Sequence, residues 1–389
     1  MNKRKILVRG PALSRSDYGE QCRTVLRALR SDERNDIYLL NIGWANSGWI
    51  FEDTEERQWI DNTIMHTAKA VQSGIRDFDV SVQVQLPIEW QKLCKHNIGI
   101  TLGVETTSVP DNWNTSCQDM DKIIVPSQHS KNSFSDEVQG KFEVINFPVK
   151  KVKTKKIDLD INTNFNFLTV AQWNPRENLE QTISSFINEF QNEQVGLIIN
   201  TNIVGGSHID REHVRERLEL LINHTVQNKS CKVYLLHGSL SDEEVASLYK
   251  NKNISAYVTT SHGETFGLSA FNAAQHGVPI IASNWGGVKD FSNDSFIELE
   301  YEEKELEEHQ IWENIYEPGS KWCFPKTTSV RTQMREVYNN LNKYKKIAKT
   351  LQNTISENFT EQSVYLCYNN VIDDVVKTVE TLGDTNETE

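Results

Sequence analysis

The residues best suited to chemistry lie together in one stretch of the chain, residues 261–283. Glu264 is followed closely by Gly267, and the apolar segment 268–275 comes next and reads as a helix. The first turn of a helix offers free N–H groups and a partial positive charge, which together suit a phosphate group. Gly267 lets the backbone approach such a group closely, and the Glu264 carboxylate is placed to bind hydroxyls beside it. The pattern favours an anionic ligand that also carries a polyol.

Two strands are expected to hold this helix in position. Residues 256–259 form an apolar run before Glu264, and residues 279–282 form another soon after Gly277, a residue type that ends helices. A strand, a loop, a helix and a second strand in this order are the repeating unit of a parallel sheet. The alternative is that the unit binds no ligand and that Glu264 is an ordinary surface carboxylate.

The same alternation of strands and helices extends along the chain, which predicts an α/β protein with two doubly wound parallel sheets. In the first half we expect strands at residues 5–9, 36–40, 80–85, 98–102, 122–125 and 142–145. In the second half we expect strands at residues 167–171, 195–200 and 233–236, before the unit that contains Glu264. We expect helices at residues 127–134, 178–190, 210–224, 330–353 and 361–379, and a capping box at Ser241 opens a further one.

Changes in composition indicate where the chain divides. Residues 1–148 form a first Rossmann-like domain and residues 165–355 a second. The linker 149–164 between them is rich in lysine and poor in apolar residues. Residues 356–380 are expected to form a C-terminal helix, and residues 381–389 a disordered tail.

The overall composition narrows the class of protein. The chain has 389 residues, 38% of them hydrophobic and 24% charged, which is typical of a soluble globular protein. Its formal net charge of −13 argues against a dominant nucleic-acid surface, because binding phosphate backbones needs clustered Lys and Arg. The apolar run 6–8 is too short for a signal peptide or a membrane span, and the six cysteines form no CxxC pair. We therefore expect a cytoplasmic protein with reduced thiols and no integral membrane segment.

The stretch around Glu264 resembles the donor-site signature of retaining glycosyltransferases of family 4 (group 1), which have the GT-B fold. In that family a Glu, seven intervening residues and a second Glu contact the donor sugar and the ribose of the nucleotide. These two positions hold Glu264 and Asn272 here, and Asn272 can hydrogen-bond a ribose only without the help of a charge. The resemblance covers roughly residues 5–375 and is sharpest over residues 233–291.

The resemblance implies two Rossmann-like domains that face a central cleft. Residues 1–148 would bind the acceptor, residues 165–355 would bind the donor nucleotide-sugar, and the C-terminal helix 356–380 would pack back on the first domain. The implied reaction moves a sugar from a nucleotide diphosphate-sugar, with UDP favoured, to a hydroxyl acceptor with retention of configuration. No metal and no other cofactor is expected. The acceptor stays open: a glycan, a protein, a small molecule or a modified DNA base.

The resemblance and the positions of the loops together give a set of candidate site residues. Glu264 and Glu105 are expected to be catalytic. The residues expected to bind the donor are Gly19, Arg176, His237, Gly238, Phe266, Gly267, Leu268, Asn272 and Lys289.

Two positions depart from the family pattern where the diphosphate would bind. The Arg and Lys positions of the family hold Gln172 and Glu177 here, and a glutamate repels a diphosphate. Arg176 could supply the lost charge or could simply pair with Glu177, and Lys289 is the other basic candidate. The departures keep two further interpretations open. One is a GT-B protein that binds a nucleotide or glycan without turnover, and the other is a GT-B sugar epimerase.

Several residues have a structural interpretation beside the functional one. Glu105 could orient the acceptor, act as a base or be an ordinary solvated carboxylate. His237 and His262 could contact phosphate or be satisfied within the fold, and Trp285 could stack on a ligand or pack in the core. Residues 158–160 spell the DxD motif of metal-dependent glycosyltransferases, but they lie in the linker, which favours an ordinary surface role.

Overall fold

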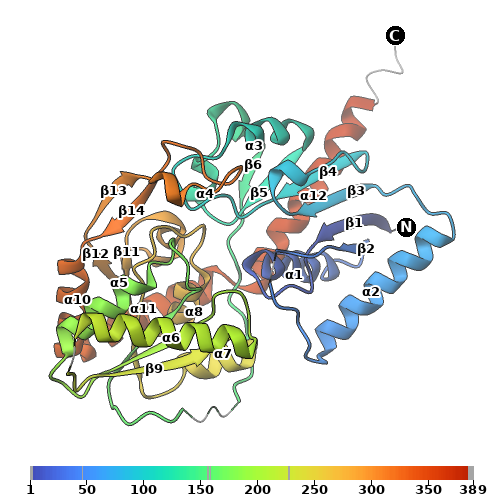
Figure 1. The fold of residues 1–389 in the computed structure, drawn as a ribbon. Coiled ribbons are helices and arrows are strands. Elements are labelled where there is room, and N and C mark those ends of the chain that lie inside the picture. Colours follow the sequence, from blue (N-terminus) through green and yellow to red (C-terminus); the bar gives the residue numbers. More distant parts are fainter. Residues whose placement is uncertain (1–2, 46, 156, 158, 227, 384–389) are drawn as a thin grey trace.

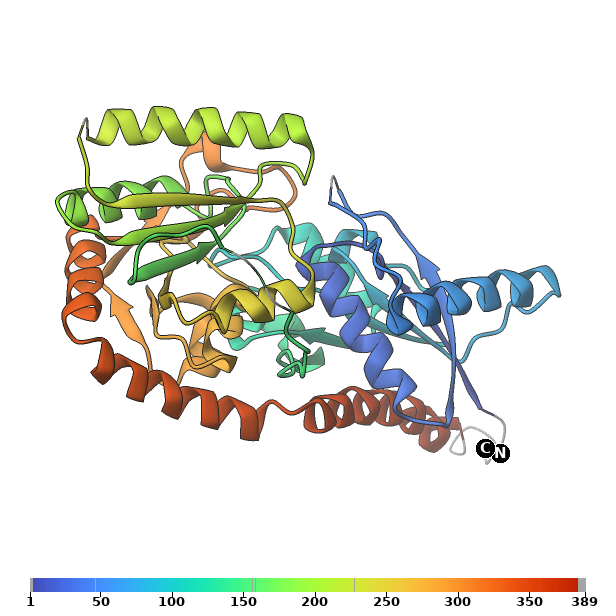
Figure 2. The ribbon, with the colours of Figure 1, turned by 90° about the horizontal axis from the view of Figure 1, so that it is seen from below.

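The computed structural model describes residues 3–383 except residues 46, 156, 158 and 227, and it has two α/β domains that face each other (Figures 1 and 2). The first domain holds a six-stranded sheet in the order β2-β1-β3-β4-β5-β6, and every neighbouring pair is parallel. Its strands are β1 (Arg4–Gly10), β2 (Asn35–Asn41), β3 (Val80–Val84), β4 (His96–Ile100), β5 (Lys122–Val125) and β6 (Phe142–Val144). The strands expected in this half are confirmed, with ends that differ by one or two residues.

The helices of the first domain are α1 (Asp17–Arg30), α2 (Glu55–Gln72), α3 (Asp111–Ser116) and α4 (Gln128–Asn132). α1 begins after Ser16, whose hydroxyl accepts a hydrogen bond from the Gly19 N–H. Gly19 leaves no room for a side chain, because a Cβ there would lie 2.1 Å from the carbonyl oxygen of Ser14. This close approach fixes the loop between β1 and α1 at the carboxyl edge of the sheet.

The second domain repeats the design with a parallel sheet in the order β12-β11-β10-β7-β8-β9. Its strands are β7 (Asn166–Val170), β8 (Gly196–Thr201), β9 (Lys232–His237), β10 (Ile254–Val258), β11 (Ile280–Ser283) and β12 (Ile297–Leu299). Its helices are α5 (Leu179–Phe190), α6 (His208–Thr225), α7 (Asp242–Tyr249), α8 (Leu268–Gln275) and α9 (Lys289–Ser292). The expected capping box opens α7, where Ser241 and Glu244 each accept a hydrogen bond from the backbone N–H of the other.

Burial explains the apolar runs from which the strands were predicted. β3 and β10 are buried along their whole length, as expected for central strands of a sheet that is covered on both faces. One cluster of buried apolar residues extends through both domains, and the rings of Phe147 and Phe266 meet there with centroids 5.2 Å apart. The two domains therefore share part of their hydrophobic core.

The end of the chain runs along one side of both domains as α10 (Thr327–Asn339), α11 (Leu341–Asn358) and α12 (Glu361–Gly383) (Figure 2). The single helix expected over residues 330–353 is wrong. The chain breaks at Asn340, which has φ −125° and ψ 34°, and asparagine favours such a non-helical position because its side chain competes for backbone hydrogen bonds.

α12 packs along α1 of the first domain. Gln21 of α1 donates a hydrogen bond from Nε2 to the Tyr368 hydroxyl at 2.6 Å. The helix reaches Gly383 rather than ending at residue 380. Residues 384–389 of the expected disordered tail lie outside the described residues, as does Asp158 of the linker DxD triplet.

An antiparallel hairpin that the sequence analysis did not predict follows β12. Its strands are β13 (Tyr301–Glu305) and β14 (Lys321–Pro325), and residues 306–320 between them are called the hairpin loop below. The hairpin contacts the first domain, because Trp113 Nε1 donates to the carbonyl oxygen of Asn314 at 2.9 Å and Lys321 N donates to Thr107 Oγ1 at 2.9 Å. The hairpin therefore ties the two domains together beyond the β12 edge of the second sheet.

Candidate functional site

Glu264 lies in the loop between β10 and α8, at the carboxyl edge of the second sheet. Gly267 directly precedes α8 with φ +86°, a conformation that glycine adopts without strain. The first backbone hydrogen bond of the helix runs from Phe271 N to Gly267 O at 2.9 Å. The N–H groups before Phe271 therefore have no acceptor within the helix, which leaves them available to a ligand.

Two further glycines press against the backbone of Glu264. A Cβ on Gly286 would lie 2.7 Å from the Glu264 carbonyl oxygen, and Gly286 has φ +75°. Gly287 donates its N–H to the same oxygen at 2.8 Å. The loop after β11 thus fixes the position of Glu264.

Arg176 lies at the centre of the site and faces three carboxylates. Its guanidinium lies 2.5 Å from Glu177, 3.5 Å from Glu105 and 3.6 Å from Glu264. Nη1 also donates a hydrogen bond to the Gly263 carbonyl oxygen at 2.7 Å. The side chain is 19% exposed, so it is enclosed without being cut off from solvent. One cation therefore links two carboxylates of the second domain to a carboxylate of the first.

Glu105 is the contribution of the first domain, from the loop that follows β4. The Tyr316 hydroxyl of the hairpin loop donates to Glu105 Oε2 at 3.0 Å, while Oε1 faces Arg176. The backbone of this loop also touches the second domain, because a Cβ on Gly263 would lie 2.2 Å from the Glu105 carbonyl oxygen. Glu105 is thus held from two sides at the junction of the domains.

The crowding of acidic groups changes their protonation. Burial and then the neighbouring Glu177 raise the pKa of Glu264, Arg176 opposes the rise, and the resulting pKa is about 8. Burial likewise raises the pKa of Glu177 against the opposing effect of Arg176. Desolvation also raises the pKa of Asp17, the first residue of α1, with Arg176 opposing and Glu105 adding to the rise. Glu264 therefore holds a proton at neutral pH that a free carboxylate would release.

Hydrogen bonds between loops keep the domains together on the other side of the site. The Ser127 hydroxyl, at the start of α4, donates to the Thr265 carbonyl oxygen. Asp290 of α9 accepts a hydrogen bond from the Gln128 N–H at 2.7 Å. Asp290 thus binds the first turn of a helix in the other domain, so this contact also joins the two domains.

Three of the expected donor-binding residues lie on the β9 and α8 side of the site. His237, at the end of β9, places Nε2 2.7 Å from Asp210 Oδ2 and is only 6% exposed. Gly238 follows with φ +97°. Asn272 is half-buried on α8, and its Oδ1 accepts a hydrogen bond from Gln275 Nε2 at 2.7 Å. His237 is therefore satisfied within the fold, and Asn272 already has a partner for its side-chain oxygen.

The remaining expected donor-binding residues differ in what they offer. The Phe266 side chain is 1% exposed and packs in the core, which leaves only its backbone near the loop. Leu268 is half-buried in the first turn of α8. Lys289 is exposed, and no ion pair joins it to another described residue. Gly19 lies in the first turn of α1, where its N–H donates to the Ser16 hydroxyl.

The structure also shows the contacts of Gln172, His262 and Trp285. Gln172 donates to the Ile203 carbonyl oxygen at 2.8 Å. His262 is buried, and its Nδ1 lies 2.8 Å from the Cys323 carbonyl oxygen of β14. Trp285 is 9% exposed and packs with the hairpin, with its ring centroid 4.8 Å from that of His129. All three therefore have structural contacts that account for them.

Sequence reasoning missed two residues of the site, Tyr316 and Asp17. Tyr316 lies 211 residues along the chain from Glu105, and nothing in its local pattern connects the two. The only signal was that two aromatic residues, Trp312 and Tyr316, lie close together in a segment without a predicted helix or strand. Asp17 was visible in the loop after β1 but was not singled out. In the part of the chain that the structure describes, no three acidic, His or Cys side chains gather closely enough to hold a metal ion.

Comparisons with known proteins bear on these expectations. Residues 152–312 match the family described as glycosyl transferases group 1, and this span includes Arg176, Glu264 and Asn272. No curated protein sequence matches the chain.

Solved structures extend the likeness over nearly the whole chain. The chain is similar to HepE of Anabaena in complex with UDP and glucose, with a TM-score of 0.63 and 15% identity over 95% of this chain and 100% of that one. It is similar to sucrose-phosphate synthase of Thermosynechococcus elongatus, with a TM-score of 0.64 and 13% identity over 97% of this chain and 100% of that one. It is also similar to a glycosyltransferase of Rickettsia africae, with a TM-score of 0.63 and 14% identity over 97% of this chain and 100% of that one.

These findings confirm the expected GT-B fold and the resemblance to group 1 glycosyltransferases. Among the helices of the described residues, none combines the length and the apolar character that crossing a membrane requires.

Proposed function

We propose that this chain, with its GT-B fold and its group 1 glycosyltransferase match, transfers a sugar from a nucleotide diphosphate-sugar to a hydroxyl group of an acceptor. The observation that carries the proposal is the position of Glu264 and Arg176: the carboxyl and guanidinium groups lie 3.6 Å apart, and Arg176 also faces Glu105 of the first domain. UDP is the favoured nucleotide, and the complexes of Anabaena HepE with UDP and UDP-glucose support that preference.

The donor diphosphate binds at the N-terminus of α8 in this proposal. The free N–H groups and the positive end of the helix suit the phosphates, and Gly267 permits their close approach. Arg176 adds a positive charge as the leaving diphosphate becomes more negative. Glu264 holds hydroxyls of the sugar. With its pKa raised to about 8, Glu264 carries a proton at pH 7 and can donate as well as accept a hydrogen bond.

The proposed reaction proceeds with retention of configuration. The bond between the anomeric carbon and the diphosphate oxygen breaks, and the acceptor hydroxyl attacks from the same face of the sugar. Its proton passes to the leaving diphosphate, so the protein supplies positioning and positive charge rather than a strong base. Glu105 orients Arg176, and the contacts between the domains keep water away from the donor. α8 and Arg176 supply the positive charge in this scheme, which uses no metal and no other cofactor.

A second candidate function is favoured by one observation. Arg176 already faces Glu105, Glu177 and Glu264, so a donor diphosphate must compete with three carboxylates for it. Asn272 weakens the ribose contact as well, because its oxygen is occupied by Gln275. A GT-B protein that binds a nucleotide or a glycan without turnover is therefore the alternative.

A thermal-shift screen against UDP, GDP, ADP and their sugars tests donor binding. A ligand present at 100 times its dissociation constant stabilises a fold by about 2.7 kcal/mol. We expect one nucleotide-sugar to raise the melting temperature of the wild type, and Glu264→Gln to reduce the shift. Glu357→Gln, an exposed carboxylate on α11, is the matched control and should leave the shift unchanged. If no nucleotide or nucleotide-sugar gives a shift, the donor site that we propose does not exist.

A further inference from the structure

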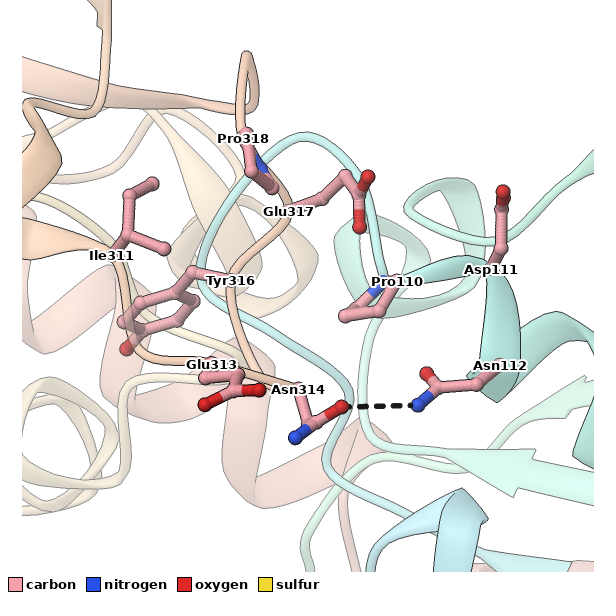
Figure 3. A pocket seen from close by; sticks show the side chains of 9 residues that line it. All are labelled: Pro110, Asp111, Asn112, Ile311, Glu313, Asn314, Tyr316, Glu317 and Pro318. Carbon is pink, nitrogen blue, oxygen red and sulfur yellow. Dashed lines mark hydrogen bonds between the residues drawn. The ribbon is translucent and has the colours of Figure 1, made fainter.

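A cavity of about 320 Å³ lies between the first domain and the hairpin loop, outside the Glu264 site (Figure 3). We call it the loop pocket. The start of α3 forms one wall with Pro110, Asp111 and Asn112, and the hairpin loop forms the other with residues that include Asn314 and Glu317. The pocket therefore exists only because the hairpin meets the first domain.

Hydrogen bonds hold both walls in place. Asn112 Nδ2 donates to Asn314 Oδ1 at 3.4 Å across the pocket, as the dashed line in Figure 3 marks. The carbonyl oxygen of Asn314 accepts the indole N–H of the buried Trp113 at 2.9 Å. Asn314 has φ +63°, an uncommon conformation that the hairpin loop maintains between these two bonds. Asn314 thus connects the hairpin loop to the first domain at the pocket.

The lining of the pocket combines flat apolar surface with oxygen-rich polar groups. Pro110 and Tyr316 supply apolar surface, and the amides of Asn112 and Asn314 supply donors and acceptors. Asp111, Glu313 and Glu317 also line it, no lysine or arginine does, and none of the three forms an ion pair with a described residue. A negatively charged ligand is repelled by such a lining, whereas hydroxyl groups find acceptors in it.

Tyr316 connects the loop pocket to the Glu264 site. Its side chain lines the pocket, and its hydroxyl bonds Glu105, which faces Arg176 at 3.5 Å. Arg176 in turn lies 3.6 Å from Glu264. The loop pocket therefore adjoins, through Tyr316 and Glu105, the site at which we propose that the donor sugar binds.

An exposed aromatic residue, Trp312, lies in the chain between two residues that line the pocket, Ile311 and Glu313. Trp312 is 63% exposed, and its carbonyl oxygen accepts the N–H groups of Ile315 and Tyr316, both at 2.9 Å. It therefore belongs to the same turn as the pocket wall. An indole held at the surface by a fixed turn does not gain the free energy of burial in the unbound protein. It offers a rigid apolar face to a partner.

We propose that the loop pocket binds the acceptor and that the acceptor is a saccharide without acidic groups, with one sugar ring stacked on Trp312. The proposal rests on the proposed function, because it assigns the acceptor of that transfer. The residues of the loop pocket differ from those of the donor site, so an experiment can refute one proposal without refuting the other.

Saturation-transfer NMR with the full chain tests the proposal directly. The probes are methyl glycosides of glucose, galactose, mannose and N-acetylglucosamine, with glucuronic acid as the acidic counterpart. We expect at least one neutral glycoside to receive magnetisation, and Trp312→Ala to reduce the transfer at least fivefold. Phe51→Ala, at another aromatic residue that is 83% exposed, should leave it unchanged. Glu264→Gln should also leave it unchanged, which separates this site from the donor site.

The charge of the lining gives a second readout. Glucuronic acid should show no transfer to the wild type, and Glu313→Gln/Glu317→Gln should admit it without loss of the neutral glycoside. The nucleotide-induced thermal shift of Trp312→Ala should equal that of the wild type, which also shows that the variant folds. The proposal is overturned if no neutral glycoside binds in a Trp312-dependent way, or if glucuronic acid binds the wild type equally well.

Discussion

Replacing Arg176 by methionine removes the cation that Glu105, Glu177 and Glu264 share while keeping a side chain of similar length. The three carboxylates lie 2.5–3.6 Å from the guanidinium, which is 19% exposed. Removing one partner of a buried ion pair costs about 3–5 kcal/mol, because it leaves a charge buried without compensation. We expect Arg176→Met to lose about that much stability at pH 8.

The loss should depend on pH. Glu177 and Glu264 already have raised pKa values in the folded protein, and without Arg176 these pKa values rise further. The folded variant then binds more protons than the unfolded chain, so its stability falls as pH rises. Each additional bound proton changes the free energy of unfolding by about 1.4 kcal/mol per pH unit. The destabilisation should therefore be clearly smaller at pH 5.5 than at pH 8.

Urea unfolding followed by tryptophan fluorescence at both pH values measures this effect. Arg215→Met is the control, because Arg215 also contacts two carboxylates, Glu212 and Glu219, but is 51% exposed on α6. An exposed pair contributes about 0–1 kcal/mol, so this control should change little at either pH. Equal losses for the two variants, or an Arg176→Met loss that does not grow with pH, would refute the account of a charge-crowded site.

Four other substitutions test three separate parts of the structure. Because the pKa of Glu264 is raised from 4.5 to about 8, the free energy of unfolding falls as pH rises between those values. Urea unfolding of Glu264→Gln should show a pH slope of this free energy that is smaller by about one proton. An unchanged slope would show that Glu264 is ionised. Gly238→Ala should cost about 1–2 kcal/mol through its φ of +97° alone, whereas Gly286→Ala should cost more because its Cβ would also meet the Glu264 backbone; thermal unfolding that ranks them in reverse order would contradict this. Phe266→Ala should cost about 3–5 kcal/mol by leaving a cavity in the shared core, and a loss below 1 kcal/mol would argue against a joint core.

Local sequence patterns predicted the part of the site that lies within one strand–loop–helix unit. The helix expected over residues 268–275 is α8 with the same ends, because Gly267 and Gly277 bound an apolar run on both sides. The Ser241 capping box was equally readable, since both of its hydrogen bonds join residues three positions apart. Contacts of this range are set by the residues themselves, so the sequence alone is enough to find them.

Contacts between distant segments were not readable in this way. The hairpin loop has no regular apolar period, so neither the hairpin nor the bond from Tyr316 to Glu105 could be inferred. Of the three carboxylates around Arg176, only Glu177 was considered as a partner from the sequence. Glu105 and Glu264 come from other loops. The break at Asn340 escaped notice because apolar spacing continues through it.

For some side chains the sequence left open whether they contact a ligand or another residue of the fold. His237 could have faced a ligand, but Asp210 lies 2.7 Å from it, and Asp210 also accepts the N–H groups of Ile203 and Val204. Such choices depend on where α6 begins relative to β9, which no pattern in either segment specifies.

Turnover of a nucleotide-sugar distinguishes a glycosyltransferase from a protein that only binds the nucleotide. The wild type and Glu264→Gln would be incubated with UDP-sugars and GDP-sugars, together with neutral glycosides as acceptors, and the released nucleotide would be measured over time. The account predicts release well above the spontaneous rate with one donor, and a loss of at least tenfold in Glu264→Gln under conditions where the variant still binds the nucleotide. Binding of a nucleotide-sugar without release of nucleotide, with or without an acceptor, would contradict the assignment as a glycosyltransferase and would favour the non-catalytic binding protein.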